Sequence, residues 1–118
     1  MSLIINSLDG IPLQGIIVVG VLMSIQSFGD KATEIFYLTG VLPRNAGWQS
    51  VAKIATRKLD MIGYAKILDD LKAPPNNRLE KLRGDFIGFY SIRINDQWRI
   101  LFQWDQNGPS KVRILDYH

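Results

Sequence analysis

Apolar residues change their spacing along this chain. Up to about residue 85 they recur every three or four positions, which predicts helices, and from residue 86 onward they alternate with polar residues, which predicts β-strands. The apolar members of the first two alternating runs are Tyr90, Ile92 and Ile94, then Trp98, Ile100, Phe102 and Trp104. A last strand is expected from Lys111 to Leu115, with Val112 and Ile114 pointing inward.

Short polar turns separate these runs. Asn95-Asp96 lies between the first two, and both residue types tolerate the positive φ of a tight hairpin turn. Residues 106–109 form the next turn, so the strands predict an antiparallel meander. If the aromatic residues face the core, Arg93 and Arg99 lie on the opposite face of the sheet. The sequence thus predicts one apolar and one cationic sheet face.

The segment before the sheet begins with a short strand and a capped helix. Ser24 to Phe28 alternates weakly and predicts the strand. Asp30 is a suitable N-cap for a helix that extends to about Leu38, because its carboxylate can accept hydrogen bonds from free N–H groups of the first turn. Gly40 suits the end of that helix, since glycine readily adopts the left-handed conformation.

Two further helical segments are expected. Pro43 can open a longer helix with one mainly apolar stripe. That stripe consists of Val51, Ile54, Ala55, Lys58 and Ile62. After Gly63 the helical spacing resumes from Tyr64 to Lys72, and the proline-rich residues 73–77 end it. The whole pattern predicts an α+β fold, in which helices cover one face of an antiparallel sheet and leave the other partly open.

The chain of 118 residues is long enough for one domain with its own core. Residues 1–22 contain no Lys or Arg, and the apolar run from Ile16 to Met23 is too short to span a bilayer and lacks the basic flank of a signal peptide. We therefore expect an appended segment at 1–22, a core domain at 23–118 and no membrane role. Met23 is a candidate natural start, and an extra packed strand or arm within residues 1–22 is the alternative.

Charge and cysteine content narrow the chemistry. Residues 43–83 hold nine basic and four acidic residues, a net charge of +5 within a chain of net charge +3. A basic segment suits a polyanionic partner, and a merely solvated surface is the alternative. The chain has no cysteine and one histidine, so we expect no metal site. Residues 84–88 lack the spacing of a phosphate-binding loop, so no nucleotide cofactor is expected. Cytoplasm is the default location, since the absence of cysteine suits a reducing compartment.

The residue types that RNA cleavage requires occur in the second half of the chain. RNA can be cleaved without a metal because its 2′-hydroxyl can attack the adjacent phosphate, aided by a base, by cations near the phosphate and by an acid for the leaving oxygen. The candidates are Glu80 and Asp116 as bases, Arg83 and Arg99 as phosphate clamps, and Tyr117 and His118 as proton donors or base-stacking groups. An exposed residue or an ion pair is the alternative for each.

Other basic residues are candidates for contact with the RNA backbone. They are Lys81, Arg93, Arg113, Arg78, Lys53 and Arg57. At the C-terminus, Tyr117 shares the outward parity of Arg113, whereas Asp116 shares the inward parity of the core residues. Tyr117 is therefore the better candidate for facing RNA beside Arg99, and Asp116 for anchoring the strand end or orienting His118.

Three stretches in this order resemble a known family. They are Pro-Pro-Asn-Asn-Arg-Leu-Glu-Lys-Leu-Arg-Gly-Asp at 74–85, Gly-Phe-Tyr-Ser-Ile-Arg-Ile-Asn-Asp-Gln-Trp-Arg-Ile at 88–100, and the terminal Asp-Tyr-His at 116–118. The combination resembles the HigB-type plasmid-maintenance killer proteins of the RelE/ParE toxin superfamily. Residues 25–28 after Met23 also resemble the first strand of that family, so the resemblance covers residues 23–118.

The resemblance implies a RelE-like fold and a toxin that cleaves messenger RNA in the ribosomal decoding site without a metal or other cofactor. It also implies inhibition by a helix-turn-helix antitoxin of HigA type. The active face would use Arg83, Arg99 and the terminal residues 116–118. Of these we expect Arg99 and residues 116–118 to be indispensable. Glu80 stands where some members have histidine; a carboxylate can act as a base but not as an imidazolium, so we expect it to be supportive.

Two other functions remain open for the same fold. One is inhibition of DNA gyrase in the manner of ParE proteins, which needs no catalytic residues; the Asp-Tyr-His end argues against it. The other is a catalytically inactive module that binds RNA or protein, which the replacement of histidine by Glu80 leaves open.

Overall fold

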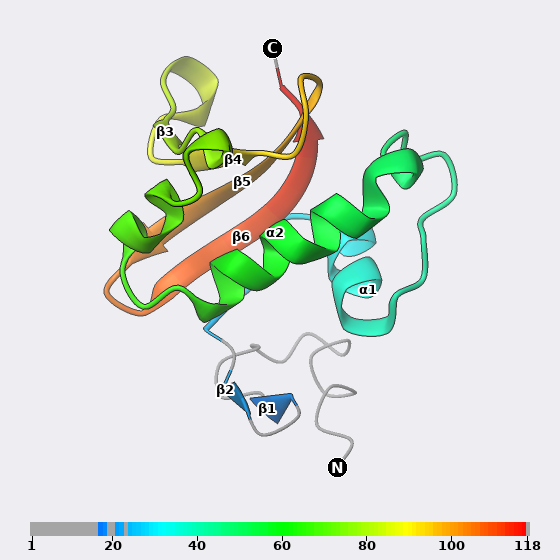
Figure 1. The fold of residues 1–118 in the computed structure, drawn as a ribbon, viewed down its shortest axis with the longest axis horizontal. Coiled ribbons are helices and arrows are strands. Elements are labelled where there is room, and N and C mark those ends of the chain that lie inside the picture. The colour runs from blue at the N-terminus through cyan, green and yellow to red at the C-terminus, as the bar shows by residue number, and fades with distance from the viewer. Residues whose placement is uncertain (1–16, 19–20, 23, 118) are drawn as a thin grey trace.

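The structure, a computed structural model, describes residues 17–18, 21–22 and 24–117, and it has an α+β architecture (Figure 1). Helices pack on one face of a four-stranded antiparallel sheet whose strands follow the chain in the order β3-β4-β5-β6. These strands are β3 (Glu80–Lys81), β4 (Tyr90–Arg93), β5 (Trp98–Asp105) and β6 (Gly108–Asp116). The predicted fold class and antiparallel meander are confirmed. The last strand begins at Gly108, earlier than the predicted Lys111, so the second turn is shorter than expected.

A separate two-stranded sheet precedes this unit. It joins β1 (Ile17–Val18) to β2 (Val21–Leu22) in antiparallel register. The remaining positions up to residue 23 lie outside the described residues. The division into an appended segment at 1–22 and a domain at 23–118 therefore stays a prediction.

Helix α1 (Lys31–Thr39) has the two ends that the sequence predicts. The Asp30 carboxylate accepts a hydrogen bond of 2.8 Å from the Thr33 amide, which satisfies one of the free donors of the first turn. At the other end Gly40 has a φ of 79°, and its amide donates to the carbonyl of Phe36. Both predicted ends of this helix, at Asp30 and Gly40, are confirmed.

Helix α2 (Ala52–Tyr64) follows a single 3-10 turn, η2 (Gln49–Val51), and does not begin at Pro43. That predicted start is wrong because Asn45 and Gly47 have φ values of 63° and 87°, which no right-handed helix accommodates. The predicted apolar stripe is largely correct. The buried members of α2 are Ala55, Lys58, Leu59, Ile62 and Gly63.

The predicted helix from Tyr64 to Lys72 is also wrong in its limits. Tyr64 is the last residue of α2, Ala65 is extended, and only a short 3-10 helix follows, η3 (Leu68–Lys72). The Asp70 carboxylate accepts hydrogen bonds of 2.9 and 3.2 Å from the amides of Lys66 and Ile67, which holds the chain in a turn at this point. A further 3-10 turn, η4 (Pro75–Asn77), leads into the sheet.

Residues 24–28 form one parallel bridge, between Phe28 and Val112, in place of the predicted strand. Neighbouring backbone hydrogen bonds extend this contact along β6, with the Gln26 amide 2.8 Å from the carbonyl of Pro109 and the Gly29 amide 2.7 Å from that of Val112. The segment thus lines the outer edge of β6.

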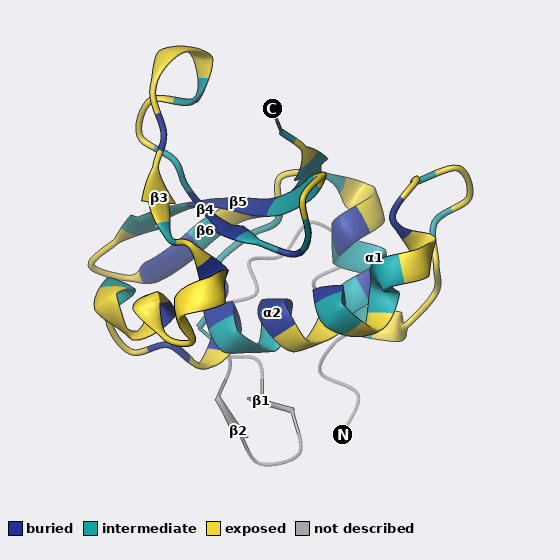
Figure 2. Cartoon of the chain, turned by 45° about the horizontal axis from the view of Figure 1, so that its top comes forward, coloured by how far each residue is buried: buried dark blue, intermediate teal, exposed yellow. Residues whose placement is uncertain are grey.

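The core lies between α2 and the inner face of the sheet, as the burial colours of Figure 2 show. Ile92 lies opposite Ile100, and Ile100 lies opposite Ile114, so the three long strands bring their apolar residues into one layer. The predicted inward faces of β4, β5 and β6 are confirmed. Among the residues that the structure describes, no helix is long and apolar enough to cross a membrane.

Candidate active site

The face of the sheet opposite the helices carries the cationic residues that the sequence predicts. Arg93 pairs with Arg99, and Ser91 pairs with both Leu101 and Glu80, so all of these point away from the core layer. We call the group Glu80, Ser91, Arg93, Arg99 and Tyr117 the cationic face. Its members come from three strands and the C-terminal end of the chain.

Arg99 is the most firmly held residue of the cationic face. Its Nε donates a hydrogen bond of 2.7 Å to the Oγ of Ser91, and its Nη2 donates one of 2.7 Å to the carbonyl of Arg78. The Arg99 side chain is only 11% exposed, and Ser91 is fully buried beneath it. Among the described residues, no acceptor bonds to Nη1. Two nitrogens therefore orient the guanidinium, and the third remains for an anion.

Glu80 supplies the countercharge to Arg99 from the edge strand β3, across the intervening strand β4. Its Oε1 lies 3.5 Å from Nη2 of Arg99, and its side chain is 56% exposed. Burial lowers the pKa of Arg99, Glu80 raises it, and the nearby Arg93 and Arg78 lower it. An arginine stays protonated against such opposing effects, so this position presents a partly desolvated cation beside an accessible carboxylate.

Arg93 has its own partner in the hairpin turn. Its Nη2 lies 2.6 Å from the Oδ1 of Asp96, and this hydrogen bond holds the pKa of the Asp96 carboxyl below its usual range. Arg93 is directly opposite Arg99, so two cations share one position along the sheet. Asp96, in the turn between β4 and β5, therefore neutralises the charge of Arg93 locally.

Tyr117 closes the other side of the cationic face through aromatic contacts. Its ring lies 5.7 Å from that of Phe86 at an angle of 75°, and Phe86 in turn contacts Phe89 at 6.1 Å. Phe86 belongs to the 3-10 turn η5 (Gly84–Phe86), in the loop between β3 and β4. That loop is thereby attached to the end of β6.

The terminal residues point to different sides, as their parity predicts. Asp116 pairs with Trp98 on the opposite face from Arg99, and its Oδ2 accepts a hydrogen bond of 2.9 Å from Nε2 of Gln97. The predicted inward parity of Asp116 is confirmed. His118, a predicted site residue, lies outside the described residues.

Several predicted RNA-binding residues lie away from the cationic face. Lys81 pairs with Tyr90, so its parity is that of the core side of the sheet. Lys53 and Arg57 are exposed on α2, in the helical layer behind the sheet. The structure therefore separates these three cations from Arg99.

Arg78, Arg83 and Arg113 belong to segments that adjoin the cationic face. Arg78 contributes its carbonyl to the anchoring of Arg99, and Arg83 is exposed at the start of the η5 loop. Arg113 lies on the outward face of β6, with its Nε 3.5 Å from the Oδ2 of Asp30. Arg113 is thus engaged with the N-terminus of α1.

Sequence reasoning missed the residues that support Arg99. Ser91 was not singled out, although its parity, shared with Arg93, places it on the same face. The sequence pattern places Lys58 in the apolar stripe of a helix and Asn77 in a segment that ends a helix. In the structure the Lys58 Nζ donates to the Oδ1 of Asn77, next to Arg78. The tertiary contact between residues 58 and 77 has no local sequence signal.

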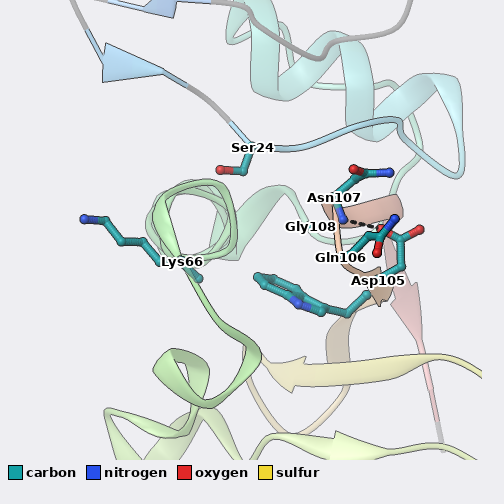
Figure 3. Close-up of a pocket in the computed structure, with 8 residues that line it drawn as sticks. Ser24, Lys66, Asp105, Gln106, Asn107 and Gly108 are labelled. Carbon is teal, nitrogen blue, oxygen red and sulfur yellow. Dashed lines mark hydrogen bonds between the residues drawn. The ribbon is translucent and has the colours of Figure 1, made fainter.

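A hollow lies at the end of β5 opposite to Arg99 (Figure 3). It has a volume of about 240 Å³ and is lined by Ser24, Ala65, Lys66, Trp104, Asp105, Gln106, Asn107 and Gly108. None of the predicted site residues lines it. Within residues 24–117 and the described part of the N-terminal hairpin, no group of three or more His, Asp or Glu side chains is arranged to hold a metal ion.

Fold and site together define a small α+β protein with a cationic site on an open sheet face. A family model described as the RelE-like toxin of the type II toxin-antitoxin system HigB matches residues 26–118. Toxin HigB-1 of Vibrio cholerae is 40% identical over 91 residues, which cover 77% of this chain and 94% of that protein. The chain therefore belongs to the HigB-like toxins, and the resemblance found in the sequence is confirmed.

Two further proteins are similar to this chain. An uncharacterized protein of Haemophilus influenzae is 42% identical over 66 residues, which cover 56% of this chain and 64% of that protein. The solved structure of a YoeB-YefM complex from Staphylococcus aureus shares 22% identity over 80% of this chain and 94% of the matched chain, with a TM-score of 0.45. The family assignment rests on the sequence matches.

Proposed function

We propose that this toxin is a ribosome-dependent endoribonuclease that cleaves translated messenger RNA without a metal. The observation that carries the proposal is the state of Arg99, which is 11% exposed, held by Ser91 and Arg78, and directed to the open face of the sheet. A fixed, partly desolvated guanidinium binds a phosphate more strongly than an exposed one, and it needs no reorganisation as negative charge develops.

The proposed reaction is an internal transfer at phosphorus. The 2′-oxygen of the ribose forms a bond to the adjacent phosphorus, the bond from phosphorus to the 5′-oxygen breaks, and a 2′,3′-cyclic phosphate and a 5′-hydroxyl result. One side chain takes the proton of the 2′-hydroxyl, and another gives a proton to the 5′-oxygen. No proton or electron is gained or lost overall, so no co-reactant is required.

We assign the phosphate to Arg99 and the proton transfers to the groups around it. Glu80 lies 3.5 Å from Arg99 and is accessible, which suits a supporting base. Tyr117 is on the same side and its ring is fixed against Phe86, which suits a proton donor or a surface for a nucleobase. Asp116 is bonded to Gln97, so in this scheme it secures the strand end and orients His118.

RNA would follow the cations that border the cationic face. Arg93 within this face, and Arg78, Arg83 and Arg113 from adjoining segments, would contribute contacts to neighbouring phosphates. Each such contact adds to the salt dependence of binding and little to sequence preference. Lys53, Arg57 and Lys81 belong to other surfaces, where negatively charged parts of the ribosome are their proposed partners.

We also propose that a helix-turn-helix antitoxin of HigA type inhibits this chain. The family is defined by type II toxin-antitoxin systems, and the relative from Vibrio cholerae is a HigB toxin. A basic protein is steered to an acidic partner surface, and the sequence pI of this chain is about 9.3. Co-expression with the neighbouring helix-turn-helix gene product should yield a complex; recovery of the toxin alone would exclude that pairing.

The test is to induce the chain in cells without an antitoxin and to map the 5′ ends of messenger RNA. New 5′-hydroxyl ends inside translated messages are expected, and a purified ribosome assay should reproduce them. Growth arrest with a DNA-damage response in place of cleavage would indicate gyrase inhibition, and the absence of arrest would indicate an inactive binding module. Either result would overturn the proposal.

Variants connect the activity to the cationic face. Replacing Arg99 by Ala, or deleting residues 116–118, should reduce ribosome-dependent cleavage by about 10²-fold or more. Arg44→Ala, at an exposed loop arginine outside the site, is the matched control and should keep full activity. Full activity in Arg99→Ala or in the shortened chain would show that the site lies elsewhere.

A further inference from the structure

A buried lysine lies behind the cationic face. Lys58 on α2 is only 3% exposed, and it is one of four polar or charged residues buried in the described domain, together with Thr33, Asn77 and Ser91. An ammonium group loses its hydration when it is buried, which opposes folding unless other contacts compensate. A buried lysine therefore calls for an explanation.

The partners of Lys58 are amide oxygens. Its Nζ donates to the Oδ1 of Asn77 and also lies 3.4 Å from the Oδ1 of Asn76, and no carboxylate among the described residues is within salt-bridge distance. Its pKa is lowered by burial and by the charges of Arg57 and Arg93. The contacts of the Lys58 ammonium group are thus made to one short segment of chain, the turn η4.

Asn77 distributes this contact to the surrounding backbone. It is fully buried, and its Nδ2 donates hydrogen bonds of 3.1 Å to the carbonyl of Leu71 and 3.2 Å to that of Ala73. Asn77 therefore joins three parts of the chain. Its side-chain oxygen accepts from Lys58 of α2, and its side-chain nitrogen donates to the carbonyls of Leu71 in η3 and of Ala73 in the following linker. Its own backbone belongs to η4 and is held in place by these bonds.

The next residue carries the carbonyl that anchors Arg99. Arg78 adopts the left-handed conformation with φ 47° and ψ 55°, which is disfavoured for residues other than glycine and persists only where the surroundings impose it. In this conformation its carbonyl oxygen lies 2.7 Å from Nη2 of Arg99. Movement of η4 would displace this oxygen.

We propose that Lys58 and Asn77 are positioning residues that set the orientation of the Arg99 guanidinium through the carbonyl of Arg78. The proposal deepens the proposed ribonuclease function and rests on Arg99 as its phosphate-binding group. Ser91 holds the Nε of Arg99 from the sheet, and the Lys58–Asn77 pair sets the position of the second anchor from the helical layer. The phosphate site is therefore linked through the edge of the sheet to the opposite layer.

A purely structural role for the pair leads to a different expectation. A buried charge can often be replaced by an apolar side chain of similar length with no loss of stability, or with a gain. Lys58→Met is such a replacement. If the pair served stability alone, a stable Lys58→Met variant would keep an unchanged site; if it positions Arg99, the variant stays folded and the site loosens.

The first experiment observes Arg99 directly by NMR. The side-chain Nε–H resonance of Arg99, assigned by its loss in Arg99→Lys, should exchange slowly with water because Ser91 accepts it. In Lys58→Met and Asn77→Ala we expect the exchange to be at least about fivefold faster, since the guanidinium has lost its second fixed anchor. Tyr37→Phe is the matched control, because it removes a different part-buried hydrogen bond to α2, at Asp60, and should leave this exchange unchanged.

The second experiment measures ribosome-dependent cleavage by the same variants. Misplacement of a catalytic group acts mainly on the chemical step, so kcat should fall about tenfold or more in Lys58→Met and Asn77→Ala, with KM changed less than about twofold. Tyr37→Phe should retain its kcat at a temperature where it is folded. Lost activity that follows the melting temperature across all three variants would contradict positioning.

The outcomes separate the two proposals. If the wild-type chain cleaves no RNA, the proposed function fails, but the exchange of the Arg99 Nε–H still decides whether the pair positions the guanidinium. Unchanged exchange in folded Lys58→Met and Asn77→Ala overturns the positioning role. If neither variant unfolds cooperatively at 25 °C, the pair is a determinant of folding and the proposal is also overturned.

Discussion

Arg93 and Arg99 lie directly opposite each other on adjacent antiparallel strands, and both point to the face of the sheet opposite the helices. Like charges in this arrangement repel each other and destabilise a sheet. Each is compensated by a different carboxylate, Asp96 at 2.6 Å from Arg93 and Glu80 at 3.5 Å from Arg99. Two guanidinium groups and their two carboxylate partners therefore meet at one place on the cationic face.

The first prediction concerns the pH dependence of the Arg93–Asp96 pair. The pKa of Asp96 is lowered by the hydrogen bond from Arg93, so the pair stabilises the fold above the unfolded-state value of about 3.9 and loses this effect as the pH falls through the lower folded value. Arg93→Gln should raise the pKa of Asp96, as measured by carboxyl NMR titration. Lys72→Gln, at a cation paired with Asp69, should leave it unchanged.

The second prediction separates the roles of Arg99 and Glu80. A lysine at position 99 cannot reproduce the planar arrangement that reaches both Ser91 and the carbonyl of Arg78, so Arg99→Lys should reduce cleavage by about 10²-fold. Glu80→Gln keeps the size and removes the charge, and we expect a loss of about tenfold or less. The measurement is single-turnover cleavage on ribosomes. A loss in Glu80→Gln as large as that in Arg99→Lys would make Glu80 the principal base.

The third prediction concerns Tyr37. Its hydroxyl donates a hydrogen bond of 2.6 Å to Asp60, and burial, followed by this bond, raises its pKa above the ordinary value. The folded state therefore keeps this proton where the unfolded state loses it, so the contribution is complete below about pH 10 and falls as the pH rises above that value.

A spectroscopic titration tests Tyr37. Of the four tyrosines, this one should remain protonated in the folded chain at about pH 11, where an ordinary tyrosine is mostly ionised. The absorbance change of Tyr37→Phe up to about pH 11 should therefore equal that of the wild type. The same variant should lose about 1 kcal/mol of unfolding free energy at neutral pH. Ionisation of all four tyrosines together near pH 10 would contradict the prediction.

The fourth prediction compares two glycines of similar conformation. Gly47 has a φ of +87°, and a Cβ there would lie 2.8 Å from Cζ2 of Trp98; Gly40 has a φ of +79°, and a Cβ there would meet nothing within 4 Å. Gly40→Ala should cost about 1 kcal/mol from backbone strain alone. Gly47→Ala should cost about 1–3 kcal/mol more, because the indole must move. Urea unfolding measures both, and equal costs would exclude the clash.

The sheet was predictable from the sequence because its information is local. Alternation fixes which residues share a face, so the outward positions of Arg93 and Arg99 followed from placing the aromatic residues inward. The expected two-residue turn at Asn95-Asp96 is wrong, because it would pair Arg93 with Trp98, whereas residues 94–97 separate the two strands and Arg93 pairs with Arg99. The caps of α1 were predictable for the same reason, since Asp30 and Gly40 act within a few residues. These features depend little on the rest of the chain.

The errors arose where distant contacts decide the local structure. Pro43 is a suitable first helical residue, but the chain turns at Asn45 and Gly47 so that Trp98 can pack on Gly47. Gly63 remains inside α2, where its carbonyl accepts a hydrogen bond of 3.2 Å from the amide of Ser24. Period and propensity carry no information about such partners.

The supporting residues of the site were unpredictable on the same grounds. Lys58 and Asn77 are 19 positions apart, and each has an ordinary local explanation, in a helix stripe and in a proline-rich turn. Only the fold brings them together beside Arg78. Family resemblance points to the residues proposed to touch RNA more readily than to the residues that hold them in place.

The segment from Ser27 to Gly29 also covers an edge of the sheet. An uncovered strand edge offers a row of free amides and carbonyls to which another chain can add, which leads to aggregation. Here the parallel bridge at Phe28 occupies part of the outer edge of β6, and the opposite edge, β3, is only two residues long. Both edges of the sheet are thereby protected from pairing with a strand of a second copy of this toxin.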